Sequence, residues 1–152
     1  MLIPASRFPT LPEGCPVRFR SANLPGTVRE PVANGYRVEI ANAAPMPGGV
    51  RDSTLVGPAH LDVDLTTPAA VRAFAPGLIA AVKERTRFTG PQRQPSAVWH
   101  TGFCRWILVD YLTDSDAVVA YEPTTTLILG STPEECLLNG LKAAMDAAKD
   151  AQ

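Results

Sequence analysis

The chain has 152 residues, of which 45% are hydrophobic and 19% are charged, with a formal net charge of −1 at pH 7. This composition fits one globular domain or two small ones with a buried core and excludes a disordered chain. The sequence has no membrane-length apolar run and no signal-peptide pattern, and its three widely spaced cysteines favour a reducing cytoplasm over a disulfide-stabilised secreted domain.

The N-terminal part of the sequence predicts an extended segment followed by short strands. Residues 1–13 are expected to be extended. Val17 and Phe19 then alternate with two arginines, and Asn34-Gly35 between alternating runs is typical of a β-hairpin. The predicted strands lie within 16–21, 26–30, 36–41, 53–57 and 60–65.

The stretches PVRFR, GTVRE, GYRVEI and STLVGPAHLDVDL occur in that order. In order and strand type they resemble the small SH3-like barrels of bacteria. The resemblance covers residues 14–65 and implies a closed antiparallel barrel, with no catalytic motif.

The next segment is predicted to be helical. Thr67 is a suitable N-cap, Pro68 suits the first helical position, and apolar residues recur at helical spacing up to Arg85. Pro76-Gly77 interrupts this pattern, so we expect a kink or two short helices within 68–85. Residues 85–95 are expected to form a polar loop.

The last third predicts strands and a C-terminal helix. Strand-rich sequence covers 97–112, and further strands are expected over 117–122 and 124–130. Thr132, Pro133 and Glu135 form a capping box that starts a helix over 133–149, in which Gly140 marks close packing. Asp62 and Asp64, in the earlier strand, are expected on its solvent face.

The segment TLILGSTPEECLLNGLKAAMDAA is similar to the strand–G-x-T-x-E-E–helix segment of HicB-like antitoxins. That resemblance implies a helix packed against a small antiparallel sheet. In that family the fold holds a partner toxin, but the segment that precedes the strand there and the appended DNA-binding domain have no counterpart here.

Together these elements predict an α+β protein. An SH3-like antiparallel barrel over 14–65 is followed by an α+β unit over 66–152 that ends in the C-terminal helix. Because units of this size have small cores, we expect them to be fused into one globule.

The segment AVWHTGFCRW suggests a Cys–His site, with Cys104 as nucleophile, His100 as base and Asp110 as its orienting group. If 97–112 is one strand, however, residues four apart are separated by roughly 13 Å, which favours a structural role in the core. A small-molecule pocket is a further alternative, lined by Trp99, Phe103, Trp106 and Tyr111.

A basic segment offers a different kind of site, because arginines around an aromatic side chain suit phosphate contact and base stacking. Arg18, Arg20, Arg29 and Arg37 on nearby strands would extend it, although the net charge of −1 argues against a basic domain. The candidate binding residues are Lys83, Arg85, Arg87, Phe88 and Arg93.

No nucleotide-binding, hydrolase or metalloprotease motif is present, and no second pair of ligands accompanies Cys15, Cys136 or His60, so neither metal nor cofactor is expected.

Residues 1–105 have 12 Lys/Arg and 7 Asp/Glu, whereas residues 106–152 have 2 and 8. These features favour a non-catalytic cytoplasmic protein that binds another protein or itself. Nucleic-acid binding, a Cys/His enzyme and a small-molecule binder remain the alternatives, and no membrane association is expected.

Overall fold

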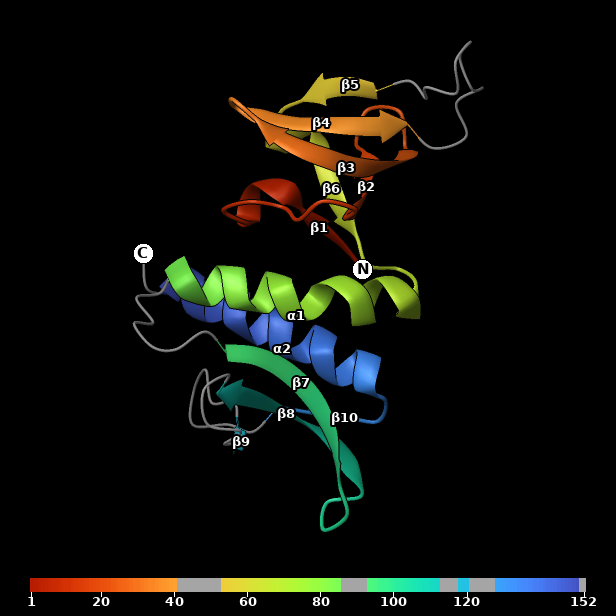
Figure 1. Cartoon of the computed structure of the whole chain (residues 1–152). Helices are drawn as coiled ribbons and strands as arrows, with labels where there is room; N and C mark the ends of the chain where they lie inside the picture. Colours follow the sequence, from red (N-terminus) through yellow and green to blue (C-terminus); the bar gives the residue numbers. More distant parts are fainter. Residues whose placement is uncertain (41–52, 86–92, 113–117, 121–127, 151–152) are drawn as a thin grey trace. The chain divides into compact units, whose positions relative to one another are not determined.

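The computed structural model describes residues 1–40, 53–85, 93–112, 118–120 and 128–150. By their internal contacts the residues divide into two compact units, Met1–Ala70 and Val71–Gln152. Mostly antiparallel sheet and two helices confirm the predicted α+β class (Figure 1). In the described part of the chain, neither helix combines the length and apolar character needed to cross a membrane.

The first unit is an antiparallel sheet in which all five predicted strands are present. They are β2 (Pro16–Phe19), β3 (Leu24–Val32), β4 (Gly35–Ile40), β5 (Ser53–Val56) and β6 (Leu61–Asp64). A sixth strand, β1 (Leu2–Pro4), comes from the segment expected to be merely extended, and 3-10 turns occupy Ala5–Arg7 and Pro58–His60. The strand order is β1-β6-β2-β3-β4-β5, and the closure of a barrel stays a prediction.

Alternation along these strands separates the core from the surface, as predicted. Val17 and Val63 are partners across β2 and β6, and both are buried. Asp62 and Asp64 point to the other face, where they pair with Arg20 and Arg18. The strands therefore have one apolar face and one face of paired charges.

The turn between β3 and β4 lies one residue earlier than predicted. Val32 pairs with Gly35, so Ala33 and Asn34 form the turn, and Asn34 has a positive φ of 65°. Gly35 is needed for a different reason: a Cβ there would lie 2.3 Å from the carbonyl oxygen of Val56 on β5.

Helix α1 (Pro68–Arg85) is continuous, so the two-helix alternative is wrong. Its N-terminus is capped as predicted, because the amide of Ala70 donates a 3.2 Å hydrogen bond to Oγ1 of Thr67. Pro76 lies inside the helix and has no N–H to donate to the preceding turn, yet the helix continues for nine residues beyond it.

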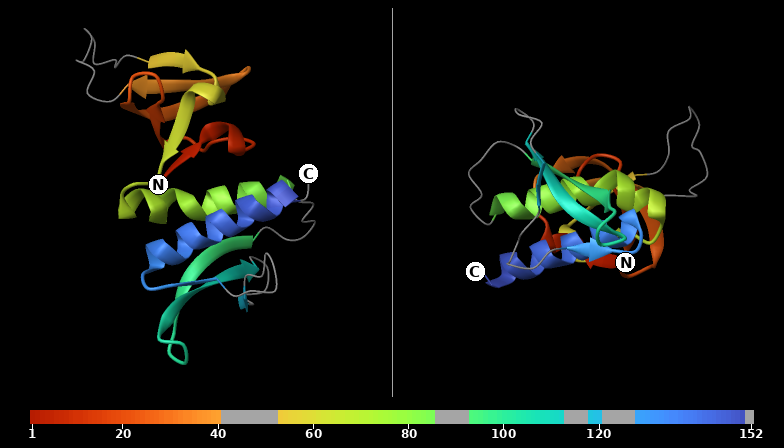
Figure 2. Two further views of the ribbon diagram at one scale, coloured as in Figure 1. Left: turned by 180° about the vertical axis from the view of Figure 1, so that it is seen from behind. Right: turned by 90° about the horizontal axis from the view of Figure 1, so that it is seen from below.

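The sheet of the second unit has the order β10-β8-β7, with β9 also paired to β8. Its strands are β7 (Arg93–His100), β8 (Arg105–Leu112), β9 (Val118–Ala120) and β10 (Leu129–Gly130). Most of the strand predicted over 124–130 lies outside the described residues. Helix α2 (Pro133–Asp150) follows β10 and contacts β7, β8 and β10, which is the local strand–helix arrangement predicted for this segment (Figure 2).

The start and the buried face of α2 agree with the sequence. The Glu135 amide donates to Oγ1 of Thr132, as a capping box requires. Oε2 of Glu135 accepts from the amide of Ser131, whereas a capping box would use the amide of Thr132, one residue later. Gly140 lies against the sheet, because a Cβ there would be 2.4 Å from Cδ2 of Leu108. The buried residues of α2 are Cys136, Leu137, Gly140, Leu141, Ala144 and Met145.

Candidate functional site

The segment interpreted as one strand over 97–112 is instead a β-hairpin. β7 and β8 pair antiparallel along their whole length, and residues 101–104 form the turn. His100 lies opposite Arg105, and Trp99 lies opposite Trp106. Figures 1 and 2 show the turn of this hairpin projecting away from α2. Thr101-Gly102 between two apolar stretches is the sequence signal for this turn.

The conformation of the turn is held by contacts among its own residues. The Phe103 amide donates a 3.2 Å hydrogen bond to Nδ1 of His100, and the two rings stack with centroids 4.5 Å apart. The Cys104 amide donates to the Thr101 carbonyl at 3.3 Å. Gly102 lets the imidazole lie against the backbone, because a Cβ there would be 2.9 Å from Cε1 of His100. The turn is therefore pre-organised.

The aromatic side chains of this turn are accessible to solvent. Trp99 and Phe103 are each 50% exposed. Trp99 meets Trp106 edge to face, with ring centroids 5.9 Å apart, so the two indoles share one side of the hairpin. Leu108 follows Trp106 on that side and is fully buried beside α2. The covered face thus ends in a pair of tryptophans of which Trp99 is exposed and Trp106 is half-buried. We call Trp99, His100, Phe103, Arg105 and Trp106 the hairpin tip.

The Cys–His–Asp arrangement predicted from the sequence does not form. His100 Nδ1 accepts from the Phe103 amide, while the exposed Cys104 thiol donates to the Thr101 carbonyl at 3.4 Å. Both residues lie in the described part of the chain, and no hydrogen bond joins the thiol to the imidazole. Asp110 pairs with Pro95, five residues along the ladder from His100, which separates their backbones by roughly 16 Å. Asp110 is therefore too distant to orient His100.

The four aromatic residues proposed to line a small-molecule pocket are not gathered in one place. Phe103 stacks on His100 at the turn, whereas Trp99 and Trp106 meet on the side of the hairpin that leads to Leu108. Tyr111 pairs with Gln94, near the opposite end of the hairpin. The backbone positions of these residues therefore do not support one pocket lined by all four.

Of the basic candidates that the structure describes, only Arg93 lies on the hairpin, at the start of β7. Lys83 and Arg85 are in the last turn of α1, and Arg93 begins β7, seven residues or roughly 23 Å along the strand from His100. Arg87 and Phe88 lie outside the described residues. Arg93 is therefore distant along β7 from the aromatic side chains at the turn, and a basic binding surface stays a prediction.

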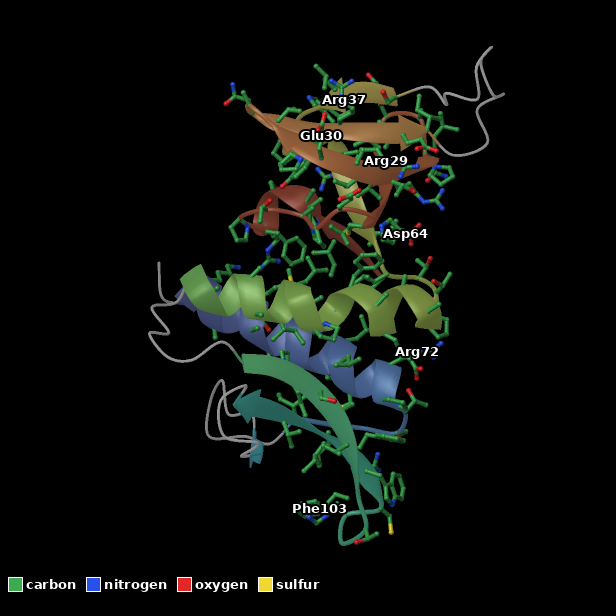
Figure 3. All side chains as sticks on the ribbon, viewed as in Figure 1. Arg29, Glu30, Arg37, Asp64, Arg72 and Phe103 are labelled. Carbon is green, nitrogen blue, oxygen red and sulfur yellow. The ribbon has the colours of Figure 1, made fainter. Side chains whose placement is uncertain are left out.

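The arginines expected to extend the basic segment are neutralised. Arg18 binds Asp64 at 3.3 Å, Arg20 binds Asp62 at 2.9 Å, Arg37 binds Glu30 at 2.9 Å, and Arg29 binds Glu39. Figure 3 shows several of these side chains on the first unit. Each cation already has a carboxylate, so this face is a ladder of ion pairs and not an open phosphate-binding surface.

Asp64 belongs to this ladder. Burial acts to raise its pKa, but hydrogen bonds from the hydroxyl and amide of Thr66 and from Arg18 outweigh that effect and lower the pKa below its usual value. Asp64 therefore stays ionised opposite Arg18 at neutral pH.

The sequence did not indicate the groove of the first unit. It has a volume of about 440 Å³ and lies beside the β3–β4 turn. Tyr36 contributes to it, with its hydroxyl already bound by the Leu11 amide at 3.1 Å. The lining residues are Pro9, Thr10, Pro31, Val32, Asn34, Gly35, Tyr36 and Pro58. None of these side chains is charged or nucleophilic in a way that would support catalysis.

Within the described ranges, no three His, Cys, Asp or Glu side chains lie close enough together to hold a metal ion. The hairpin tip is therefore the candidate site that the structure defines best. No protein-family model, curated protein or solved structure matches this chain.

Proposed function

We propose that this protein is a non-catalytic, cytoplasmic binding protein that engages another protein through the hairpin tip. The observation that carries the proposal is the half-exposure of Trp99 and Phe103 on a turn fixed by its own contacts. The three cysteines are free, in keeping with a reducing compartment.

Exposed aromatic side chains on a rigid turn suit protein recognition for energetic reasons. Tryptophan and arginine are enriched among the few interface residues that carry most of the binding energy. A turn that is already ordered loses little conformational entropy on binding. His100 and Gly102 therefore serve the site indirectly, because they hold Phe103 in place.

The shape of the tip favours a macromolecular partner over a small molecule. Small-molecule sites are concave and bury most of the ligand. The tip instead projects from its sheet, so it would have to enter a depression on the partner. Figure 3 shows Phe103 at the end of this projection.

Site-specific photo-cross-linking tests the proposal. The full chain would be made with p-benzoylphenylalanine at position 103 and irradiated in lysate of the source organism. As a control, the same group would replace Leu55, an exposed apolar residue of β5 that is 61% accessible. We expect a discrete adduct from position 103 and none of that mass from position 55.

Competition decides whether the adduct is specific. Excess unlabelled wild-type protein should abolish it, whereas excess protein carrying Trp99→Ala and Phe103→Ala should not. An adduct that both competitors abolish equally, or the absence of any adduct at position 103, would refute the proposal. An adduct at twice the mass of the chain would identify the partner as a second copy, and nuclease-sensitive material would point to nucleic acid instead.

A further inference from the structure

Arg105 differs from the arginines that form ion pairs, because no carboxylate in the described part of the chain pairs with it. Its side chain is exposed and donates one 3.2 Å hydrogen bond from Nη1 to the hydroxyl of Ser131. By contrast, Arg72 pairs with Glu134, and Arg18, Arg20, Arg29 and Arg37 also have carboxylate partners. Arg105 therefore presents most of its donors to solvent.

From this cation and its neighbours we infer that the partner surface carries a carboxylate beside an apolar side chain, and that Arg105 binds that carboxylate. The inference rests on the proposed function and names the chemistry of its partner. Arg105 lies directly opposite His100, whose ring stacks on the half-exposed Phe103. The charge thus lies beside the His100–Phe103 pair, on the side of the hairpin opposite to the two indoles.

This combination matches an acidic and apolar protein segment. A guanidinium binds a carboxylate with two parallel hydrogen bonds, and these strengthen where neighbouring apolar groups exclude water. Phe103, stacked on His100, would supply the apolar surroundings of the bound carboxylate. Arg105 would fix the orientation, and the rings would provide the buried area.

A polyanion is a poorer fit to the same surface. Ser131, the partner of Arg105, also donates its amide to the carboxylate of Glu135. This carboxylate repels every phosphate of a polyanion that follows the surface, whereas a partner segment brings a single carboxylate to Arg105. The electrostatics therefore favour an acidic peptide segment over a nucleic-acid backbone.

Selection from a random peptide library tests the inference directly, because it requires no identified partner. A phage-displayed library of random twelve-residue peptides would be selected on the full-length protein. We expect the binders to contain Asp or Glu next to Leu, Ile, Phe or Trp. In anisotropy titrations Arg105→Gln should weaken the binding of the selected peptides about tenfold or more. Arg105→Lys should weaken their binding less, because the charge remains and only the bidentate geometry is lost.

Arg37→Gln is the matched control, because it removes an exposed arginine that already has a carboxylate partner. It should leave the affinities of the selected peptides unchanged. Binders without acidic enrichment, or binders that tolerate both Arg105→Gln and Phe103→Ala, would overturn the inference. So would an oligothymidylate that binds the wild type and loses affinity in Arg105→Gln.

The cross-linking experiment separates this inference from the proposed function. An adduct at position 103 that forms equally well in an Arg105→Gln background leaves the proposed function in place and overturns the acidic partner. Loss of that adduct in Arg105→Gln, but not in Arg37→Gln, supports both. The absence of an adduct in every background refutes the proposed function itself.

Discussion

Three cysteines in this chain have two different environments. Cys15 and Cys136 are fully buried, and burial raises the pKa of Cys15 to about 12 and that of Cys136 to about 11. Glu135 adds to the effect at Cys136 by charge repulsion. Cys104 is exposed at the hairpin turn. Accessibility, and not sequence context, therefore decides which thiol can react.

We predict that one thiol per native chain reacts with a maleimide at neutral pH, and that it is Cys104. Cys15 and Cys136 should react only after denaturation, because their thiols are inaccessible and protonated. Peptide mapping after labelling, with Cys104→Ala as the control, would check this. Labelling of Cys136 in the native protein would show that α2 separates readily from β10.

The two buried thiols also predict a dependence of stability on alkaline pH. Their folded-state pKa values lie above the ordinary thiol value of about 9. Between these values the unfolded chain loses protons that the folded chain keeps, so stability falls as the pH rises. Below pH 9 they should contribute no pH dependence.

We expect the free energy of unfolding to fall by up to about 1.4 kcal/mol per pH unit for each thiol above that point. Urea titrations at several alkaline pH values would measure it. Cys15→Ala should remove one of the two contributions. An unchanged slope in that variant would mean that other groups cause the loss.

At the scale of the element, two glycines in helices have opposite surroundings. Gly77 in α1 is exposed, and a Cβ at this position would have no atom within 4 Å. Gly140 in α2 is buried against Leu108. Glycine therefore destabilises the helix without a packing reason at position 77, whereas the close packing against Leu108 requires it at position 140.

The same substitution should consequently change stability in opposite directions. Gly77→Ala should stabilise by about 0.5–1 kcal/mol, because alanine loses less backbone entropy in a helix. Gly140→Ala should destabilise by about 1–3 kcal/mol, because the new methyl group overlaps a packed leucine. Urea denaturation of both variants would measure the two effects. Stabilisation by Gly140→Ala would mean that Leu108 can move aside.

The elements differ in how far the sequence predicted them. Thr67-Pro68 and Thr132-Pro133 predicted both helix starts, because capping is a local interaction. The hairpin over 93–112 was misinterpreted as one strand, because its apolar residues continue through a turn with only one glycine. At the proposed site, the sequence drew attention to His100 and the tryptophans but not to Arg105, because only the structure shows which arginines have partners.

At the scale of the whole molecule, the charge asymmetry does not coincide with the division into units. Residues 1–70 contain 6 Lys/Arg and 6 Asp/Glu, and residues 71–152 contain 8 and 9. The change from basic to acidic sequence falls at the β7–β8 turn, inside the second unit. Opposed charges therefore provide no argument for attraction between the two units.

We predict that the full chain unfolds in one cooperative transition. Each unit is small, and the boundary between them falls inside α1, not in a linker. Val38→Ala in the first unit and Leu141→Ala in the second remove fully buried side chains, and Leu141→Ala should cost about 2–5 kcal/mol. Scanning calorimetry should show both variants shifting the same single peak. Two peaks that respond separately would show that the units are not fused.

The sequence by itself determined the features that depend on near neighbours: the α+β class, the helix starts, the five strands of the first unit and the close packing at Gly140. Tertiary structure decided the features that depend on partners distant in sequence. It paired Arg18 with Asp64 and left Arg105 without a carboxylate among the described residues, and it placed Trp99 at an exposed hairpin tip and not in a core. Helix capping and hydrophobic periodicity depend on residues close in sequence. Burial and ion pairing depend on residues that come together only when the chain folds.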